Sequence, residues 1–177
     1  MQGIEFEKKY QIQTNDWSSI SGLVVELKPS HHFWTESTDF YYYPEDFACV
    51  LRYRFGENKS EFTYKSNVKG NFSLRKELNL FLIQENQSKE VSLFAEALGF
   101  KVGPEITKKI EVFDFQDAEV CIYEAKSSAK ELCCVEIEAK NFDNIADAKE
   151  IVDGYEKKIG RELLSEIQIN NFDFFKD

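Results

Sequence analysis

Residues 4–12 read Ile-Glu-Phe-Glu-Lys-Lys-Tyr-Gln-Ile, and apolar side chains at positions 4, 6, 10 and 12 alternate with polar ones at 5, 7, 9 and 11. Because successive side chains of a β-strand point to opposite faces, this two-residue period is typical of a strand with one buried and one polar face. Similar strand patterns occur at residues 38–43, 48–55, 61–66, 72–83, 106–115, 119–125 and 132–140. The sequence therefore predicts about eight strands.

Helices are predicted between these strands. Residues 14–27 begin with Thr, Asn and Asp, which are common helix caps, and residues 88–98 and 144–159 each end at a glycine. A further helix is predicted over residues 161–167. Many strands, few helices and short connections favour an antiparallel α+β fold, either a closed barrel or one sheet with a wet face. No Gly/Ser-rich linker divides the chain, so we expect one domain over residues 1–177.

The composition restricts the class of partner. A formal net charge of −10 argues against binding a nucleic-acid polymer, because such binding needs a basic surface. The four cysteines form no C-x-x-C pair and are expected to be reduced thiols of a cytoplasmic protein. The N-terminal sequence has no apolar signal-peptide stretch, and no run approaches the ~20 apolar residues of a membrane span. We therefore expect no membrane partner.

Arginine is concentrated on the polar faces of the predicted strands. The chain has 18 lysines but four arginines, and three of these, Arg52, Arg54 and Arg75, lie on such faces. A solvated face in a lysine-rich protein would be expected to use lysine instead. The planar guanidinium suits phosphate oxygens, so these positions favour an anionic ligand.

Two carboxylate pairs share the same kind of face. Glu5 and Glu7, and likewise Glu136 and Glu138, are two residues apart and so point the same way in a strand. Paired carboxylates repel unless a cation lies between them, and carboxylate oxygens are natural ligands of Mg²⁺ and Mn²⁺. From the pattern alone, an ordinary solvated sheet and a metal–polyphosphate site both remain open.

Several motifs occur in an order that resembles the CYTH family, the triphosphate tunnel metalloenzymes. Residues 5–9 match the family's E-x-E-x-K motif near the N-terminus. Five or six motifs in register are far more specific than any one of them. The further matches are residues 39–42 (D-x-Y-Y), 51–54 (L-R-x-R), 63–65 (a strand with a lysine), 75–77 (R-x-E), 97–100 with 106–109 (a helix end and a basic strand), and 135–138 (V-E-I-E).

The resemblance implies an antiparallel, eight-stranded β-tunnel with flanking helices, in which the polar strand faces point inward. It implies that Mg²⁺ or Mn²⁺ is held by Glu5 and Glu7 together with Glu138 and Glu136. It also implies that Asp39 orients the cationic side chains, and that Glu77 either orients them or binds the metal. The residues implied to bind a triphosphate are Lys9, Arg52, Arg54, Lys65 and Arg75.

Two strands depart from the family pattern. The basic strand usually reads K-x-R, whereas this chain has Lys108, Lys109 and Ile110, so either lysine is a candidate phosphate ligand. The strand before the V-E-I-E segment often carries an aspartate, and Glu124 is the nearest equivalent here.

Three functions are compatible with this pattern. The first is metal-dependent hydrolysis of inorganic triphosphate, thiamine triphosphate or a nucleoside triphosphate. The second is a class IV adenylate cyclase, which forms cyclic AMP and pyrophosphate from ATP. The third is a non-catalytic protein that binds polyphosphate or nucleotide. In each case the partner is a small-molecule triphosphate or nucleotide, and the protein is expected to be a monomer or a homodimer.

Overall fold

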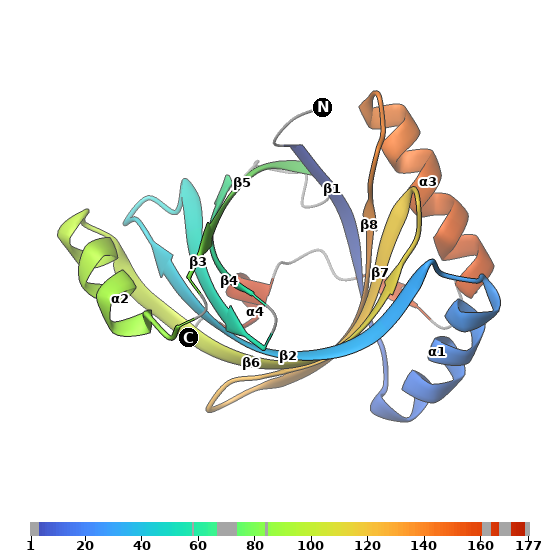
Figure 1. The fold of residues 1–177 in the computed structure, drawn as a ribbon, viewed down its shortest axis with the longest axis horizontal. Coiled ribbons are helices and arrows are strands. Elements are labelled where there is room, and N and C mark those ends of the chain that lie inside the picture. Colours follow the sequence, from blue (N-terminus) through green and yellow to red (C-terminus); the bar gives the residue numbers. More distant parts are fainter. Residues whose placement is uncertain are drawn as a thin grey trace.

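The computed structural model describes residues 4–57, 59–66, 74–83, 85–160, 164–166 and 171–175. The part of the chain that it describes contains an eight-stranded antiparallel barrel, seen end-on in Figure 1. The barrel order is β5-β4-β3-β2-β6-β7-β8-β1, and pairing of β1 with β5 closes it. The strands are β1 (Ile4–Gln11), β2 (His31–Tyr43), β3 (Cys49–Gly56), β4 (Ser60–Ser66), β5 (Leu74–Leu82), β6 (Lys101–Asp114), β7 (Ala118–Lys126) and β8 (Glu131–Ala139).

The first strand closes the barrel by pairing with two different neighbours. Ile4–Phe6 pairs with β5, whereas Glu7–Gln11 pairs with β8. A short strand, β9 (Ser165–Glu166), pairs with the end of β1 at Tyr10 and Gln11. A helix was predicted over residues 161–167, but residues 165 and 166 form a strand. Residues 161–163 and 167 lie outside the described residues.

Helices cover parts of the outer wall. After a single 3-10 turn, η1 (Thr14–Asp16), α1 (Trp17–Glu26) lies beside α3 (Ile145–Ile159), on the side of the barrel formed by β1, β7 and β8 (Figure 1). α3 begins where the Asn144 side chain accepts hydrogen bonds from two backbone amides, and it ends at Gly160, whose φ is 102°. No helix in the described ranges is both long enough and apolar enough to cross a membrane.

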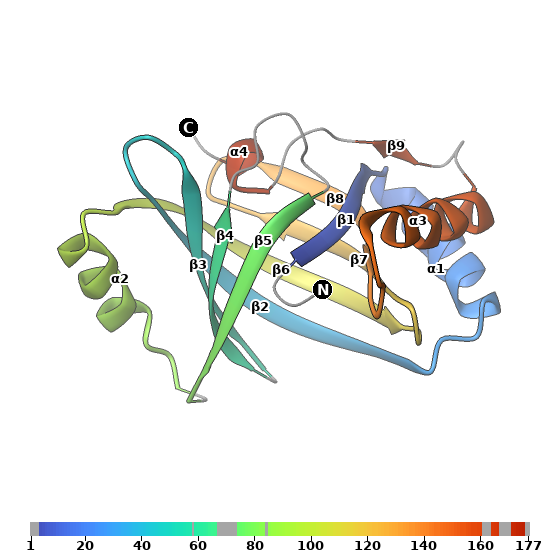
Figure 2. The same cartoon turned by 90° about the horizontal axis from the view of Figure 1, so that it is seen from above.

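Two smaller helices cover other surfaces. α2 (Ser88–Ala97) packs Ala95 over an aromatic cluster of β2 and β3 that includes Tyr42 and Tyr53. α4 (Asn171–Phe175) lies at one end of the tunnel (Figure 2). Its Phe172 and Phe175 are buried against the inner wall, so apolar packing occupies that end of the barrel.

The predicted strand over residues 38–43 is longer in the structure, because β2 begins at His31. Its first half pairs with β6 from His31 opposite Asp114 onward. His32 stacks on Phe113 and lies 2.8 Å from the buried carboxylate of Glu111. Most side chains of residues 31–36 are exposed, so no alternating pattern marked this half of the strand.

Candidate active site

The interior of the barrel contains a charged cavity of about 270 Å³. Strand alternation turns the polar faces of β1, β3, β4, β5 and β8 inward, while their apolar faces pack outward. Cations and carboxylates meet there in nearly equal number. The cationic lining residues include Lys9, Arg52, Arg54, Lys65, Arg75 and Lys108, and the acidic ones include Glu5, Glu7, Glu61, Glu77, Glu136 and Glu138.

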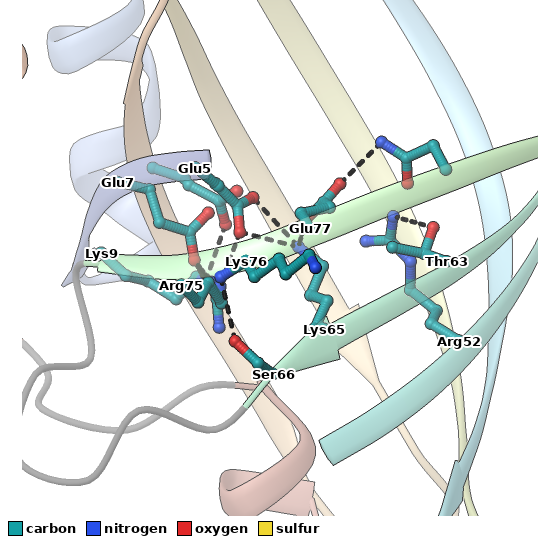
Figure 3. Close-up of polar contacts among 12 residues, drawn as sticks. Glu5, Glu7, Lys9, Arg52, Thr63, Lys65, Ser66, Arg75, Lys76 and Glu77 are labelled. Atoms are coloured by element: carbon teal, nitrogen blue, oxygen red, sulfur yellow. Dashed lines mark hydrogen bonds and ion pairs between the residues drawn. The ribbon is translucent and has the colours of Figure 1, made fainter. Parts of the chain in front are cut away.

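Glu5 accepts hydrogen bonds from two cations, Arg75 on the paired strand β5 and Lys65 on β4 (Figure 3). The Nε of Arg75 donates to it at 2.6 Å, and Lys65 Nζ donates at 3.0 Å. Lys65 also lies 2.5 Å from Glu77. Burial raises the pKa of the Glu5 carboxyl, but Lys65 and Arg75 more than offset this and hold the pKa far below its ordinary range. Glu5 is therefore ionised at neutral pH.

Glu7 and Glu136 flank Lys9. The ammonium of Lys9 lies 3.1 Å from Glu7 and 2.9 Å from Glu136, and Arg75 forms a second ion pair with Glu7. Burial raises the pKa of the Glu136 carboxyl, and Lys9 and Lys108 reverse the effect and lower it. Lys9, Arg75 and Glu136 are therefore charged at neutral pH.

Three carboxylates converge beside this network. Glu5, Glu7 and Glu138 each place an oxygen within 4.8 Å of the other two. No described residue forms a hydrogen bond or ion pair with the Glu138 side chain. Burial and the neighbouring Glu5 raise its pKa to about 8, with Lys65 opposing them and Glu136 adding to them. The Oε2 atom of Glu7 is buried and has no hydrogen-bond partner among the described residues.

The donor chemistry of this triad fits a divalent metal ion. The pKa of Glu138 is raised because its ionised form would lie beside Glu5 and Glu136, and a bound cation would relieve that repulsion; the buried, unpartnered oxygen of Glu7 offers a further ligand. Mg²⁺ and Mn²⁺ prefer such oxygen ligands. Glu5, Glu7 and Glu138 are thus the residues that would hold the ion.

A second cationic group surrounds Asp39, which is fully buried. Arg54 donates to both of its oxygens, at 2.6 and 2.8 Å, and Lys108 Nζ lies 3.0 Å away. Burial lowers the pKa of Lys108 to about 8, with Arg54 and Arg52 acting in the same direction and Asp39 opposing them. Burial raises the pKa of Asp39, whereas Arg54 and Lys108 bring it well below its usual value.

Arg52 has spare donor capacity. It binds Glu61 at 2.7 Å and Thr63 at 3.2 Å through one terminal nitrogen. Its Nε is buried and has no hydrogen-bond partner within the described ranges. A buried guanidinium N–H without an acceptor is costly, so this donor favours an anion in the cavity.

Helix α4 reaches the site through Tyr123. The Tyr123 hydroxyl lies 3.0 Å from Glu136 and 3.2 Å from the side-chain oxygen of Asn171. The Tyr123 hydroxyl has one proton and can donate to only one of these two oxygens. If it donates to Glu136, Asn171 contributes a hydrogen bond only when its amide is turned so that the NH₂ group donates to the Tyr123 oxygen. Asn171 thereby links α4 to Glu136 and on to Lys9.

Two of the predicted site residues lie on the outside of the barrel. Lys109 is 65% exposed and lies 3.7 Å from Glu36, whereas its neighbour Lys108 points inward, which settles the choice left open by the sequence. Glu124 pairs with Lys126 at 3.1 Å on the outer face. Strand parity explains both corrections, because each residue is one position away from an inward-facing one.

Several cavity residues were not predicted from the sequence. On β7 the inward positions are Glu119, Cys121 and Tyr123, which share the parity opposite to that of Glu124. Val120 and Ile122 pack in the outer core. If these two residues had been recognised as outward-facing, the residues between them would have been placed inside the barrel. The other unpredicted residues include Lys59, Glu61, Asn79, Lys140 and Asn171.

Comparison with known proteins identifies the family and the fold to which this cavity belongs. The CYTH domain family matches residues 3–168 of the chain. Among solved structures, the PH1012 protein from Pyrococcus horikoshii OT3 is 21% identical, with a TM-score of 0.77 over 98% of this chain and 99% of that one. HpAC1 from Hippeastrum, named as an adenylyl cyclase and described as having a dominant triphosphatase activity, is 13% identical, with a TM-score of 0.63 over 97% and 94%.

The RNA triphosphatase domain of a mimivirus mRNA capping enzyme is also similar in fold. It is 13% identical and has a TM-score of 0.60, with 89% of this chain and 90% of that chain covered. No curated protein matched the sequence significantly. At these levels of identity the solved structures establish a shared fold.

Proposed function

Because the chain belongs to the CYTH family, we propose that it hydrolyses a small-molecule triphosphate in a reaction that depends on Mg²⁺ or Mn²⁺. Inorganic triphosphate, thiamine triphosphate and nucleoside triphosphates are the candidate substrates. The observation that carries the proposal is the convergence of Glu5, Glu7 and Glu138 in a cavity that eight cationic side chains also line. Phosphoryl transfer needs positioning and charge neutralisation more than a covalent nucleophile, and this cavity offers both.

The carboxylate triad is the part of the site that suits a metal. When bound, Mg²⁺ or Mn²⁺ would neutralise charge on phosphate oxygens and lower the pKa of a coordinated water. Glu7 supports this role because its second oxygen has no protein partner among the described residues. Glu138 supports it because its carboxylate lies within 4.8 Å of those of Glu5 and Glu7 and forms no hydrogen bond or ion pair with a described residue.

The cationic side chains would hold the phosphates. Arg75 and Lys65 face Glu5, so both lie next to the triad and are suited to the phosphoryl group that is transferred. Arg52, through its unpartnered Nε, is suited to another phosphate. All of these cations are neutralised by carboxylates in the absence of substrate, so binding exchanges one set of charge-assisted hydrogen bonds for another.

The shape of the cavity favours entry of the phosphate chain from one end. α4 lies at the other end (Figure 2), and its Phe172 is buried there among aromatic side chains. Lys59, whose side chain is 52% exposed, lines the cavity where it reaches the surface. A mainly charged cavity that α4 borders at one end supports a substrate whose phosphates enter first. The triphosphatase activities named for HpAC1 and the mimivirus domain agree with hydrolysis.

Phosphorus NMR tests the proposal directly. Purified protein is incubated with tripolyphosphate and, separately, with ATP, first in Mg²⁺ and then in Mn²⁺. Release of orthophosphate that stops when the metal is chelated is the expected result. Pyrophosphate with cyclic AMP from ATP would instead establish a cyclase. Tight binding of triphosphate without turnover would establish a non-catalytic binding protein.

Replacing Glu7 by Gln tests the metal ligands. The substitution keeps the side-chain shape but removes a charge from the triad. Removing a residue that only hydrogen-bonds to a metal ligand typically lowers metal affinity or activity by roughly 10–100-fold. Removing the charge of a direct ligand such as Glu7 should therefore lower kcat by about 100-fold or more. Tripolyphosphate binding measured by calorimetry without metal should be largely retained, because the cations remain.

Glu124→Gln is the matched control, because it removes the same charge from the outer face. It should leave kcat unchanged. Equal losses of binding and turnover in Glu7→Gln, or equal effects of both variants, would show that Glu7 is not a metal ligand.

A further inference from the structure

The inner face of β5 changes character near the end of the strand. Arg75, Glu77 and Asn79 line the cavity and are polar. Phe81 continues the same alternation, so it belongs to the same face. It lies directly opposite Glu61 of β4, which also lines the cavity, and residues directly opposite each other in an antiparallel pair share a face. Phe81 is therefore an aromatic side chain on an otherwise polar inner face of β5.

Phe81 does not serve the apolar core. Its side chain is 70% exposed, and it belongs to none of the apolar clusters formed by the described residues. Leu82, its neighbour on the outer face, packs instead in the cluster that α2 covers. A single exposed apolar residue on an outer surface is common, but one at a polar position of a charged cavity is not. Its ring is available to a ligand of that cavity.

The Phe81 ring lies at the end of the cavity that faces away from α4. Helix α4 packs against Tyr41 of β2. The register of the four strands from β2 to β5 sets one row of residues across the inner face: Asp39, Arg54, Glu61 and Phe81. This row lies two residues along β2 from Tyr41, and β5 runs away from α4 toward the opposite end of the barrel (Figure 2).

The same row places the ring beside the cations proposed to hold phosphates. Glu61 accepts a hydrogen bond from Arg52 at 2.7 Å, and the Nε of Arg52 has no described partner. Nearer the carboxylate triad, Glu77 lies 2.5 Å from Lys65. Glu77 and Phe81 are separated by roughly 13 Å of extended strand. A phosphate chain that begins at Lys65 can therefore pass Arg52, and a group attached to its end reaches Phe81.

Phe33 is a second exposed phenylalanine on the inner face, and it differs in its neighbours. It lies opposite Val112, which in turn lies opposite Cys121 of the cavity, and it is 44% exposed. The first lysine or arginine in its row is Lys9, four strands away. Only Phe81 combines an exposed ring with adjacent phosphate-binding cations.

We propose that Phe81 is a specificity-determining residue that stacks on an aromatic ring carried by the triphosphate substrate. The inference rests on the proposed function and narrows it, from any small triphosphate to a triphosphate ester of an aromatic compound. Nucleoside triphosphates and thiamine triphosphate share this chemistry. The cations bind the phosphates of an ester and of inorganic triphosphate alike, so the ring is what separates the two. An exposed phenylalanine offers an aromatic face to any planar ring.

Calorimetric titrations with ATP, thiamine triphosphate and tripolyphosphate test the proposal, with metal chelated so that no turnover occurs. Phe81→Ala should weaken binding of at least one ester about tenfold, which is typical of losing one stacked ring, and should leave tripolyphosphate unchanged. The ester that is weakened identifies the source of the ring.

Two controls match this variant. Leu80→Ala removes an exposed side chain from the adjacent outward position, and Phe33→Ala removes the same ring from another strand of the inner face. Both should bind every ligand as the wild type does. Equal losses for tripolyphosphate and the esters, no loss for either ester, or an equal effect of a control would overturn the proposal.

Saturation-transfer NMR of the wild type provides a test that needs no variant. Ring protons of the bound ester should receive more saturation from the protein than its sugar or alkyl protons, and little transfer to the ring would contradict stacking. The outcomes also separate this inference from the proposed function. Ester binding that depends on Phe81 without hydrolysis of any triphosphate would uphold the stacking and refute the hydrolase. Metal-dependent hydrolysis with no effect of Phe81→Ala on either ester would do the reverse.

Discussion

At the scale of single residues, Lys108 is a cation of the cavity whose charge changes within an accessible pH range. Burial lowers its pKa to about 8, so it is mostly charged at pH 7 and mostly neutral at pH 9.5. A bound phosphate would favour the charged form, so protonation and binding are linked. Affinity for triphosphate should therefore fall as the pH rises above 8, by at most about tenfold per pH unit from this one group.

Lys108→Met isolates this effect, because methionine has a similar length and no charge. At pH 7 the variant should bind tripolyphosphate more weakly than the wild type, and at pH 9.5 the two should converge. Calorimetric titrations at pH 7, 8 and 9.5 measure both. Lys109→Met, on the outer face, should follow the wild type throughout. Parallel pH profiles for the wild type and Lys108→Met would contradict the assignment.

At the scale of strands and helices, the sequence predicted the wall of the barrel better than the direction of every side chain. Alternation identified β1 and β8 correctly because their outer faces pack under α1 and α3 while their inner faces carry charge. It failed on β7, where both faces are largely apolar. Val120 and Ile122 pack outward, and Tyr123 and Ala125 pack inward near α4. Glu124 was matched to an aspartate of the family pattern, and it lies one residue out of parity with the inward positions of β7.

The role of α4 could not be predicted from its sequence. A five-residue helix has no apolar period to indicate which surface it covers. Its position depends on long-range contacts. Phe172 packs against Tyr41, Tyr43 and Phe47, with ring centroids 5.2 to 6.4 Å apart.

Those contacts make α4 a structural closure of one end of the barrel. Phe172→Ala should lower the free energy of unfolding by about 3–5 kcal/mol, because it leaves a cavity among the rings. Phe94→Ala, at an exposed position on α2, should change it by less than about 0.5 kcal/mol. Urea denaturation followed by far-UV circular dichroism measures both. A loss below about 1 kcal/mol for Phe172→Ala would mean that α4 undocks without affecting the barrel.

At the scale of the whole molecule, closure of the barrel and assembly of the site are the same event. β1 supplies Glu5, Glu7 and Lys9, and it also joins β5 to β8. A chain in which β1 is unpaired would lose the triad together with the closed wall. We therefore propose that residues 1–177 fold as a single domain and unfold in one transition, and that a ligand of the tunnel stabilises the entire barrel.

That coupling predicts a measurable stabilisation by substrate. Tripolyphosphate at 100 times its dissociation constant should raise the free energy of unfolding by about 2.7 kcal/mol, provided that it binds only the folded chain. For a domain of this size the midpoint of thermal unfolding should rise by roughly 5–10 °C, in one transition. Because the chain carries a net charge of −10, added salt alone also stabilises it by screening self-repulsion. Sodium chloride at matched ionic strength is therefore the control. If chloride raises the midpoint as much as tripolyphosphate does, the buried cations do not bind the triphosphate, and two separate transitions would contradict the single domain.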